Sequence, residues 1–140
     1  IGERTAEEAK KEIGTAMPGA HPDLATEIKG RDLMTGLPKV ITITSEEINK
    51  AIIEQVEDIV AAVKEVLEKT PPELAGDIMN RGIVMTGGGS LLNGLDELIS
   101  ERTGLPTYIP EGAISCVALG TGMALQNLSV LENSNARNVL

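Results

Sequence analysis

Three consecutive glycines, Gly87, Gly88 and Gly89, constrain the fold of this 140-residue chain more than any other feature. Apolar residues that favour strands precede them at 83–85, and an apolar helical pattern follows them. Glycine permits positive φ angles and lets another group approach the backbone closely. We therefore expect a strand, a tight turn, and a helix that begins at Ser90 with unpaired N–H groups facing whatever lies over the turn. This arrangement suits a nucleotide held against bare backbone, and the alternative is a connection that binds nothing.

Three common glycine motifs do not fit this turn. A phosphate-binding loop needs a lysine after its last glycine, and none follows Gly89. The dinucleotide fingerprint and the nucleophile elbow both require glycine at position 92, which is Leu92. The single histidine, His21, also precedes Ser90, against the chain order of the hydrolases.

Composition excludes several classes of function. The net charge of −9 argues against nucleic acid as a partner, because phosphate contacts need clustered Lys and Arg. No apolar run approaches the roughly 20 residues of a membrane span. One cysteine, Cys116, and one histidine leave no internal disulfide and no zinc site, and they suit a reducing cytosol. Because the chain starts at Ile1 without an initiator Met, we expect it to be a piece of a longer protein.

The first 44 residues predict a helix followed by a hairpin. Thr5 and Glu8 have the spacing of a capping box, with Thr5 as the N-cap. Strand-like stretches at 25–31 and 39–44 are joined by a longer loop. One face of the expected helix is apolar (Ala6, Ala9, Ile13, Ala16), and the opposite face carries Glu7, Lys10, Lys11 and Gly14.

The rest of the chain alternates helices with strands, which indicates an α/β fold. A second capping box, Thr44 to Glu47, opens the longest helix. Beyond it we expect a short helix ended by Gly82, a helix from Ser90 to Gly104, a strand at 107–109 and a final helix at 115–125 whose small residues allow close packing. The long helix carries an apolar stripe: Ile48, Ile52, Val56, Ile59, Val60, Val63, Val66 and Leu67.

Three segments in this order resemble the C-terminal part of the actin-like ATPases: TAEEAKKEIG, IVMTGGGSLLNG and CVALGTGMAL. The stretches ITITSEE and TPPELAGDI narrow the resemblance to the MreB-type rod-shape proteins, the bacterial actins. The similarity covers about 125 residues and leaves out the last dozen. It implies the C-terminal half of an actin-like, ribonuclease H-like fold. Residues 1–44 would complete a small outer subdomain, residues 45–128 would form a large inner one, and residues 129–140 would be a flexible tail.

The resemblance also implies a nucleotide site. The glycine turn is the family's adenosine motif, which assigns contacts with the nucleoside and the nearby phosphate to Gly87, Gly88, Gly89 and Ser90. The polar face of the first helix is the opposite wall and includes Glu7, Glu8, Lys10 and Lys11. The segment from Gly120 to Gly122 matches a packing and hinge element. The ligand implied for the whole protein is ATP with Mg²⁺, but the phosphate loops and catalytic residues would precede Ile1. We therefore expect no catalytic residue, no metal ligand and no tightly bound nucleotide in this chain alone, although the whole protein would be a weak ATPase.

The implied function is a cytoplasmic, filament-forming protein that determines rod shape by organising cell-wall synthesis. Its expected partners are identical protomers and membrane-anchored shape and wall-synthesis proteins, at the inner face of the cell membrane. Membrane contact would come only from the part before Ile1. Two alternatives stay open: another actin-fold ATPase, such as a plasmid-segregating filament or a chaperone, and a non-enzymatic scaffold whose glycine turn is empty.

Overall fold

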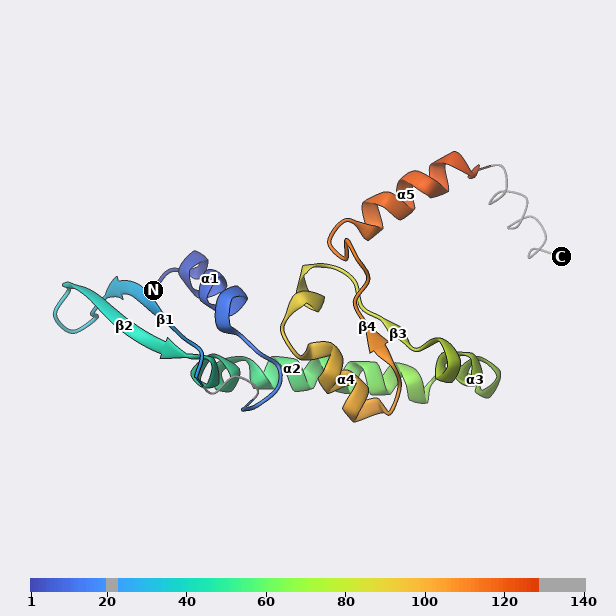
Figure 1. The fold of residues 1–140 in the computed structure, drawn as a ribbon, viewed down its shortest axis with the longest axis horizontal. Coiled ribbons are helices and arrows are strands. Elements are labelled where there is room, and N and C mark those ends of the chain that lie inside the picture. The colour runs from blue at the N-terminus through green and yellow to red at the C-terminus, as the bar shows by residue number, and fades with distance from the viewer. Residues whose placement is uncertain (20–22, 129–140) are drawn as a thin grey trace.

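The computed structural model describes residues 1–19 and 23–128, arranged as an elongated molecule (Figure 1). The α1 helix and the β1–β2 hairpin lie at one end, and α3 lies at the other. The predicted tail at 129–140 is outside the described residues. The elements in chain order are α1 (Glu3–Ile13), β1 (Ala25–Arg31), β2 (Pro38–Thr44), α2 (Ser45–Glu68), α3 (Pro72–Arg81), β3 (Ile83–Val84), the 3₁₀ turn η1 (Gly88–Leu91), α4 (Leu95–Thr103), β4 (Thr107–Tyr108) and α5 (Cys116–Gln126).

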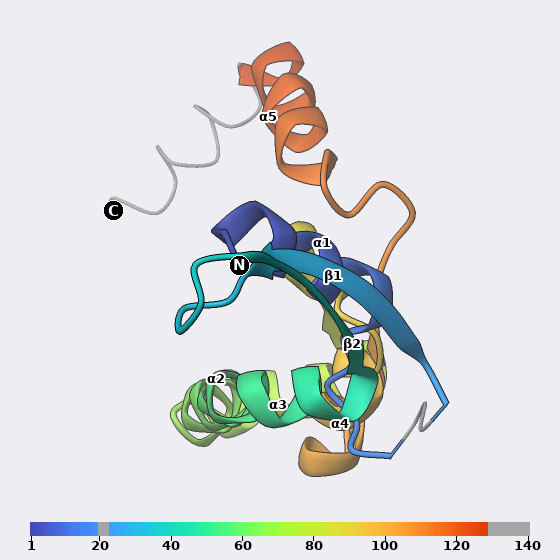
Figure 2. The same cartoon turned by 90° about the vertical axis from the view of Figure 1, so that its left-hand side faces the viewer.

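The predicted hairpin is confirmed. β1 and β2 pair antiparallel from Ala25 opposite Thr44 to Arg31 opposite Pro38. Asp32 fixes the connecting loop, because its carboxylate accepts hydrogen bonds from the backbone N–H groups of Met34 and Thr35. The hairpin arches beside α1 and leads directly into α2 (Figure 2).

The long helix α2 begins where its sequence predicts. The Thr44 hydroxyl accepts a bond from the Glu47 N–H, and the Glu47 carboxylate accepts one from the Thr44 N–H. This reciprocal pair satisfies two backbone donors that the first turn leaves unpaired. The second capping box is therefore confirmed, and α2 extends along most of the molecule (Figure 1).

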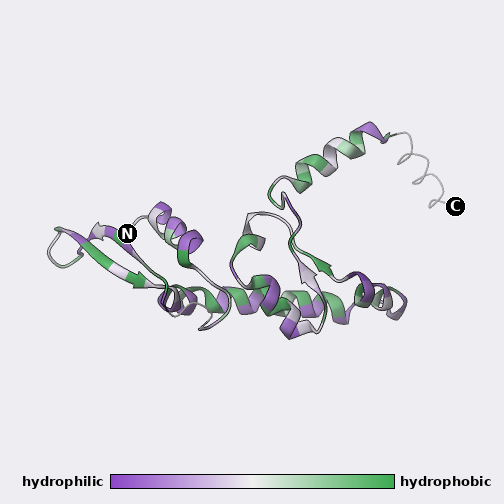
Figure 3. Cartoon of the chain, in the orientation of Figure 1, coloured by the Kyte–Doolittle hydropathy of each residue, from purple (hydrophilic) through white to green (hydrophobic). Residues whose placement is uncertain are grey.

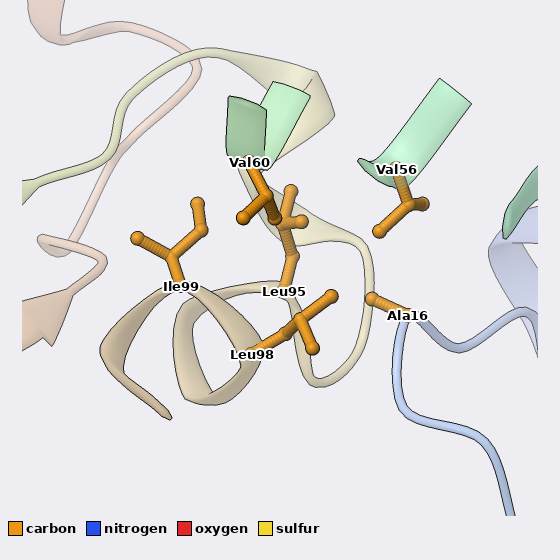
Figure 4. Packing of buried hydrophobic residues seen from close by; sticks show 6 residues of the cluster. All are labelled: Ala16, Val56, Val60, Leu95, Leu98 and Ile99. Atoms are coloured by element: carbon orange, nitrogen blue, oxygen red, sulfur yellow. The ribbon is translucent and has the colours of Figure 1, made fainter. Parts of the chain in front are cut away.

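The core lies between α2 and α4. Val56 and Val60 of α2 pack with Leu95, Leu98 and Ile99 of α4, and Ala16 closes one side (Figure 4). All six side chains are buried. Hydrophobic and hydrophilic residues alternate along both helices (Figure 3). None of the described helices is both long enough and apolar enough to cross a bilayer.

The glycine turn follows strand β3 of a short parallel sheet. Ile83 and Val84 of β3 pair with Thr107 and Tyr108 of β4. Gly82 precedes β3 at a φ of 74°, and a Cβ there would lie 2.3 Å from the Pro106 carbonyl oxygen. Only glycine allows this close approach between the two strands.

Two predicted helix starts are wrong. α1 begins at Glu3 with Gly2 as its N-cap and no side-chain cap, so Thr5 lies within the helix. No helix begins at Ser90 and continues to Gly104 either. A single 3₁₀ turn ends at Leu91, and α4 starts at Leu95 after Gly94, whose left-handed φ of 73° interrupts a helical path.

The predicted apolar faces are only partly buried. Ala6 is exposed on α1, and Ile59 and Val66 are 45% and 67% exposed on α2. α4 has nine residues against 24 in α2, so parts of the stripe on α2 have no cover among the described residues. The close packing expected for the final helix is also not seen, because no residue of α5 is buried in the described part. α5 projects away from the other elements (Figure 1).

The α2–α4 contact predicts a sharp contrast between two substitutions on one helix. Val60→Asp places an unpaired carboxylate at a site that is 2% exposed, and we expect it to cost about 3 kcal/mol or more of unfolding free energy. Val66→Asp, at 67% exposure, should change stability by less than about 0.5 kcal/mol. Urea unfolding of both variants measures the difference, and equal stability would contradict the assignment of the core.

Candidate functional site

A cleft of about 660 Å³ lies between the polar face of α1 and the glycine turn. This volume is within the range of small-molecule sites in proteins. Glu7, Lys10 and Lys11 line it from α1, and Gly88 and Gly89 line it from the turn. The structure thus brings together two segments that the sequence predicts as walls of one site. Its other lining residues are Glu12, Ile13, Gly14, Leu24, Leu91, Leu92, Asn93 and Ile114.

The glycine turn is held by hydrogen bonds that leave its middle open. Gly87 has a φ of 84°, and its N–H donates to the Ala113 carbonyl at 2.7 Å. The buried Ser90 hydroxyl donates to the Gly87 carbonyl at 2.6 Å. A Cβ on Gly88 or Gly89 would meet no atom within 4 Å. Gly87 and Ser90 therefore shape the turn from outside the cleft, while Gly88 and Gly89 present bare backbone to it.

The 3₁₀ conformation of the turn weakens the electrostatic attraction for anions that a helix N-terminus would provide. The four-residue η1 replaces the expected helix, and one turn of 3₁₀ helix carries little of the dipole that favours anions at a long helix N-terminus. The site therefore depends on close approach to backbone rather than on a helix dipole. Close approach without a Cβ suits a flat, uncharged group such as a nucleoside.

The α1 wall carries an exposed pair of opposite charges. Lys11 Nζ lies 2.6 Å from Glu7 Oε1, one helical turn away. The hydrogen bond and the charge of Lys11 lower the pKa of Glu7, with a smaller contribution from Lys10. Both side chains are exposed, so the pair adds little stability, and each partner is free to exchange it for a ligand. The Glu7 carboxylate is a hydrogen-bond acceptor beside the cleft.

Glu8 faces away from the lining of the cleft. It accepts a 2.9 Å bond from Arg4 Nε on the exposed side of α1. One residue along a helix turns a side chain by about 100°, which separates Glu8 from Glu7.

The sequence did not identify the apolar part of the lining. Leu24 and Ile114 come from loops and Leu91 ends η1, and these three segments meet only in the folded chain. Leu91 and Ile114 are 53% and 70% exposed. Their surface is available to the flat face of a bound group. The described residues contain no group of His, Cys, Asp and Glu side chains that could hold a metal ion.

The Glu7–Lys11 pair predicts a measurable pKa change. Lys11→Met should raise the Glu7 pKa towards its usual value of 4.5, and Lys10→Met should raise it less. Because folding lowers this pKa, the pair stabilises the fold above about pH 4.5, and the effect disappears as pH falls through the lowered pKa. Carboxyl-resolved NMR titration tests this, and equal shifts in both variants would refute the specific role of Lys11.

Comparison with known proteins agrees with this architecture. Residues 1–133 match the family model described as MreB/Mbl protein. The chain is 51% identical over 137 residues to the cell shape-determining protein Mbl of Bacillus cereus, covering 98% of this chain and 41% of that protein. It is 48% identical over 130 residues to the cell shape-determining protein MreB of Escherichia coli, covering 93% and 37%.

Solved structures extend the match to the fold. MreB5 of Spiroplasma citri bound to ADP superimposes with a TM-score of 0.86 at 41% identity, over 95% of this chain and 40% of that one. The same protein bound to AMPPNP gives 0.84 at 40% identity, over 100% and 40%. The chain thus spans about two fifths of the length of its relatives. The chain has the α/β fold of actin-like MreB structures, and it belongs to the MreB/Mbl family of cell shape-determining proteins.

Proposed function

We propose that this chain forms the adenosine side of an ATP site in a filament-forming protein that determines rod cell shape. The observation that carries the proposal is the cleft, in which the charged face of α1 lies opposite the open backbone of Gly88 and Gly89. The Spiroplasma relative was solved with ADP and with AMPPNP, both adenine nucleotides. This supports an adenine nucleotide as the occupant.

Each lining residue has a chemical role in this proposal. The Glu7 carboxylate accepts hydrogen bonds from ribose hydroxyls. Lys10 and Lys11 flank the nucleoside and supply positive charge. Gly88 and Gly89 let it lie against backbone, and Leu91 and Ile114 cover the flat face of the base.

Catalysis is assigned to another part of the whole protein. Phosphoryl transfer needs charged clamps on the phosphates and a bound metal ion. Among the described residues no acidic cluster is suited to Mg²⁺. We propose that this chain contacts the nucleoside of ATP with Mg²⁺, and that the whole protein is a weak ATPase.

The cellular role follows the printed names of the relatives, which are cell shape-determining proteins. We infer that identical protomers assemble into filaments in the cytoplasm, at the inner face of the cell membrane. There they would act with membrane-anchored shape and wall-synthesis proteins. The acidic net charge supports the expectation that nucleic acid is not a partner.

A single substitution in the turn tests the nucleotide site. Gly88→Val should leave the fold intact, because a Cβ at this position would meet no protein atom within 4 Å and the φ of Gly88 is not left-handed. The valine side chain would occupy the proposed nucleoside position. In a full-length protein that carries this sequence, we expect roughly a hundredfold loss of ADP affinity, or a few kcal/mol. Gly76→Val on α3, which also meets no atom within 4 Å, is the matched control. Unchanged affinity with an intact fold would favour the empty scaffold.

The 140-residue chain by itself should bind ATP weakly. It offers contacts to the nucleoside only, and small ligands gain about 0.3 kcal/mol per heavy atom. We expect a Kd of about millimolar or weaker and no hydrolysis above background. Calorimetry and a phosphate-release assay check this, and submicromolar binding or sustained turnover would overturn the half-site assignment.

A further inference from the structure

Three polar side chains are buried beneath the cleft, although none of them lines it. Thr15, Ser45 and Asn49 are 2%, 1% and 5% exposed. Thr15 follows α1 directly, and the other two belong to the first turns of α2. Buried polar groups cost free energy unless they are hydrogen-bonded, so the bonds that they make are informative.

Thr15 joins the two walls of the cleft. Its hydroxyl donates to the Asn93 carbonyl at 3.2 Å, and the Ala16 N–H donates to the same oxygen at 2.8 Å. Gly14, next to Thr15, lines the α1 side of the cleft, and Asn93 lines the other side. The bridge spans 78 positions of sequence and therefore sets how far apart the walls lie.

Asn49 holds this bridge from below. Its Nδ2 donates to the Thr15 carbonyl at 2.8 Å, inside the protein. Asn49 is on α2, the helix that packs against α4 and supports the glycine-turn side. One side chain therefore ties the α1 wall to the same helix that carries the opposite wall.

The segment after Thr15 and the segment after Asn93 are also closely packed. Gly94 follows Asn93 at a φ of 73°, and a Cβ on it would lie 2.8 Å from Cγ of Met17. Because Gly94 has no Cβ, the Met17 side chain can pack directly against it. This contact and the hydrogen bonds to the Asn93 carbonyl hold the two segments together.

We propose that Thr15 and Asn49 are positioning residues for the nucleoside: they form a buried brace that fixes the width of the cleft without touching the ligand. This inference rests on the proposed nucleotide site. Small displacements of binding groups weaken ligand contacts strongly, so a relaxed brace costs affinity even in a folded protein.

The experiment uses a full-length protein that carries this sequence, and it compares the affinities for ADP and GDP at a temperature where melting curves show every variant folded. Thr15→Val keeps the shape of the side chain and removes its hydroxyl, whereas Thr15→Ser retains the hydroxyl. Asn49→Leu removes the donor to the Thr15 carbonyl. Ser45→Ala is the matched control, because Ser45 is buried on the same helix but its Oγ has no partner among the described residues.

We expect Thr15→Val and Asn49→Leu each to weaken ADP binding roughly three- to tenfold, the factor for one neutral hydrogen bond. The ratio of ADP to GDP affinity should also fall, because a wider cleft selects the base less well. Thr15→Ser and Ser45→Ala should behave as wild type. The double variant should lose less than the product of the two single losses, because both act through one bridge.

Lower melting temperatures with unchanged ADP affinity and base selectivity would overturn the brace and leave Thr15 and Asn49 with a purely structural role. If Gly88→Val abolishes binding while the brace variants do not affect it, only the brace is wrong. If the wild-type protein binds no ADP, the nucleotide site and the brace are both refuted.

Discussion

The packing of α2 against α4 is the contact on which the rest of the structure depends. It brings Val56 and Val60 against Leu95, Leu98 and Ile99, which are far from them in sequence. α4 in turn fixes the loop that contains the glycine turn, and α2 carries Asn49 beneath α1. Burial of these branched side chains contributes roughly 1.5–3 kcal/mol each, more than any exposed ion pair on the surface. The geometry of the cleft therefore depends on the apolar contact between α2 and α4, which lies outside the cleft.

Stability and binding use different kinds of residue in this chain. The cleft is lined by exposed charges and bare backbone, which contribute little to the fold. Gly88 and Gly89 have open space where a Cβ would be, so the fold does not require glycine at either position. Gly82 and Gly94 differ from them, because their neighbours leave no room for a side chain and their φ angles are left-handed. Glycines without a structural need, beside a cleft, are the clearest indication that the turn serves a ligand.

Local signals predicted much of the fold. The capping box at Thr44 and Glu47 and the turn residues of the hairpin act over a few residues, and both are confirmed. The failures have a common cause in longer-range geometry. The helix expected at Ser90 gives way to a 3₁₀ turn because Gly94 adopts a left-handed conformation where its segment meets Met17. The exposure of Ile59 and Val66 depends on which part of α2 the partner helix covers, and the periodicity of one helix does not report this.

The candidate site, too, was predicted from the sequence only in part. Glu7, Lys10, Lys11, Gly88 and Gly89 were predicted from a resemblance and from one helical face, and the fold places them around one cleft. Ile114 and Leu24 could not be found in that way, because they reach the cleft through loops with no periodic pattern. Asn49 looks like an ordinary polar residue on an amphipathic helix, and only its buried bond to Thr15 shows that it connects the two walls.

Photolabelling with an azido-adenine nucleotide tests the central claim most directly. Trypsin cleaves the chain after Arg81 and Arg102, which gives a peptide of residues 82–102 that contains the glycine turn. It also cleaves after Lys69, so residues 70–81 form a separate peptide that contains the whole of α3. In a full-length protein that carries this sequence, the cleft predicts label in the 82–102 peptide, suppressed by excess ADP, and none in the 70–81 peptide. Label confined to peptides that contain no residue of the cleft, or label insensitive to ADP, would contradict the assignment of this cleft to the nucleoside.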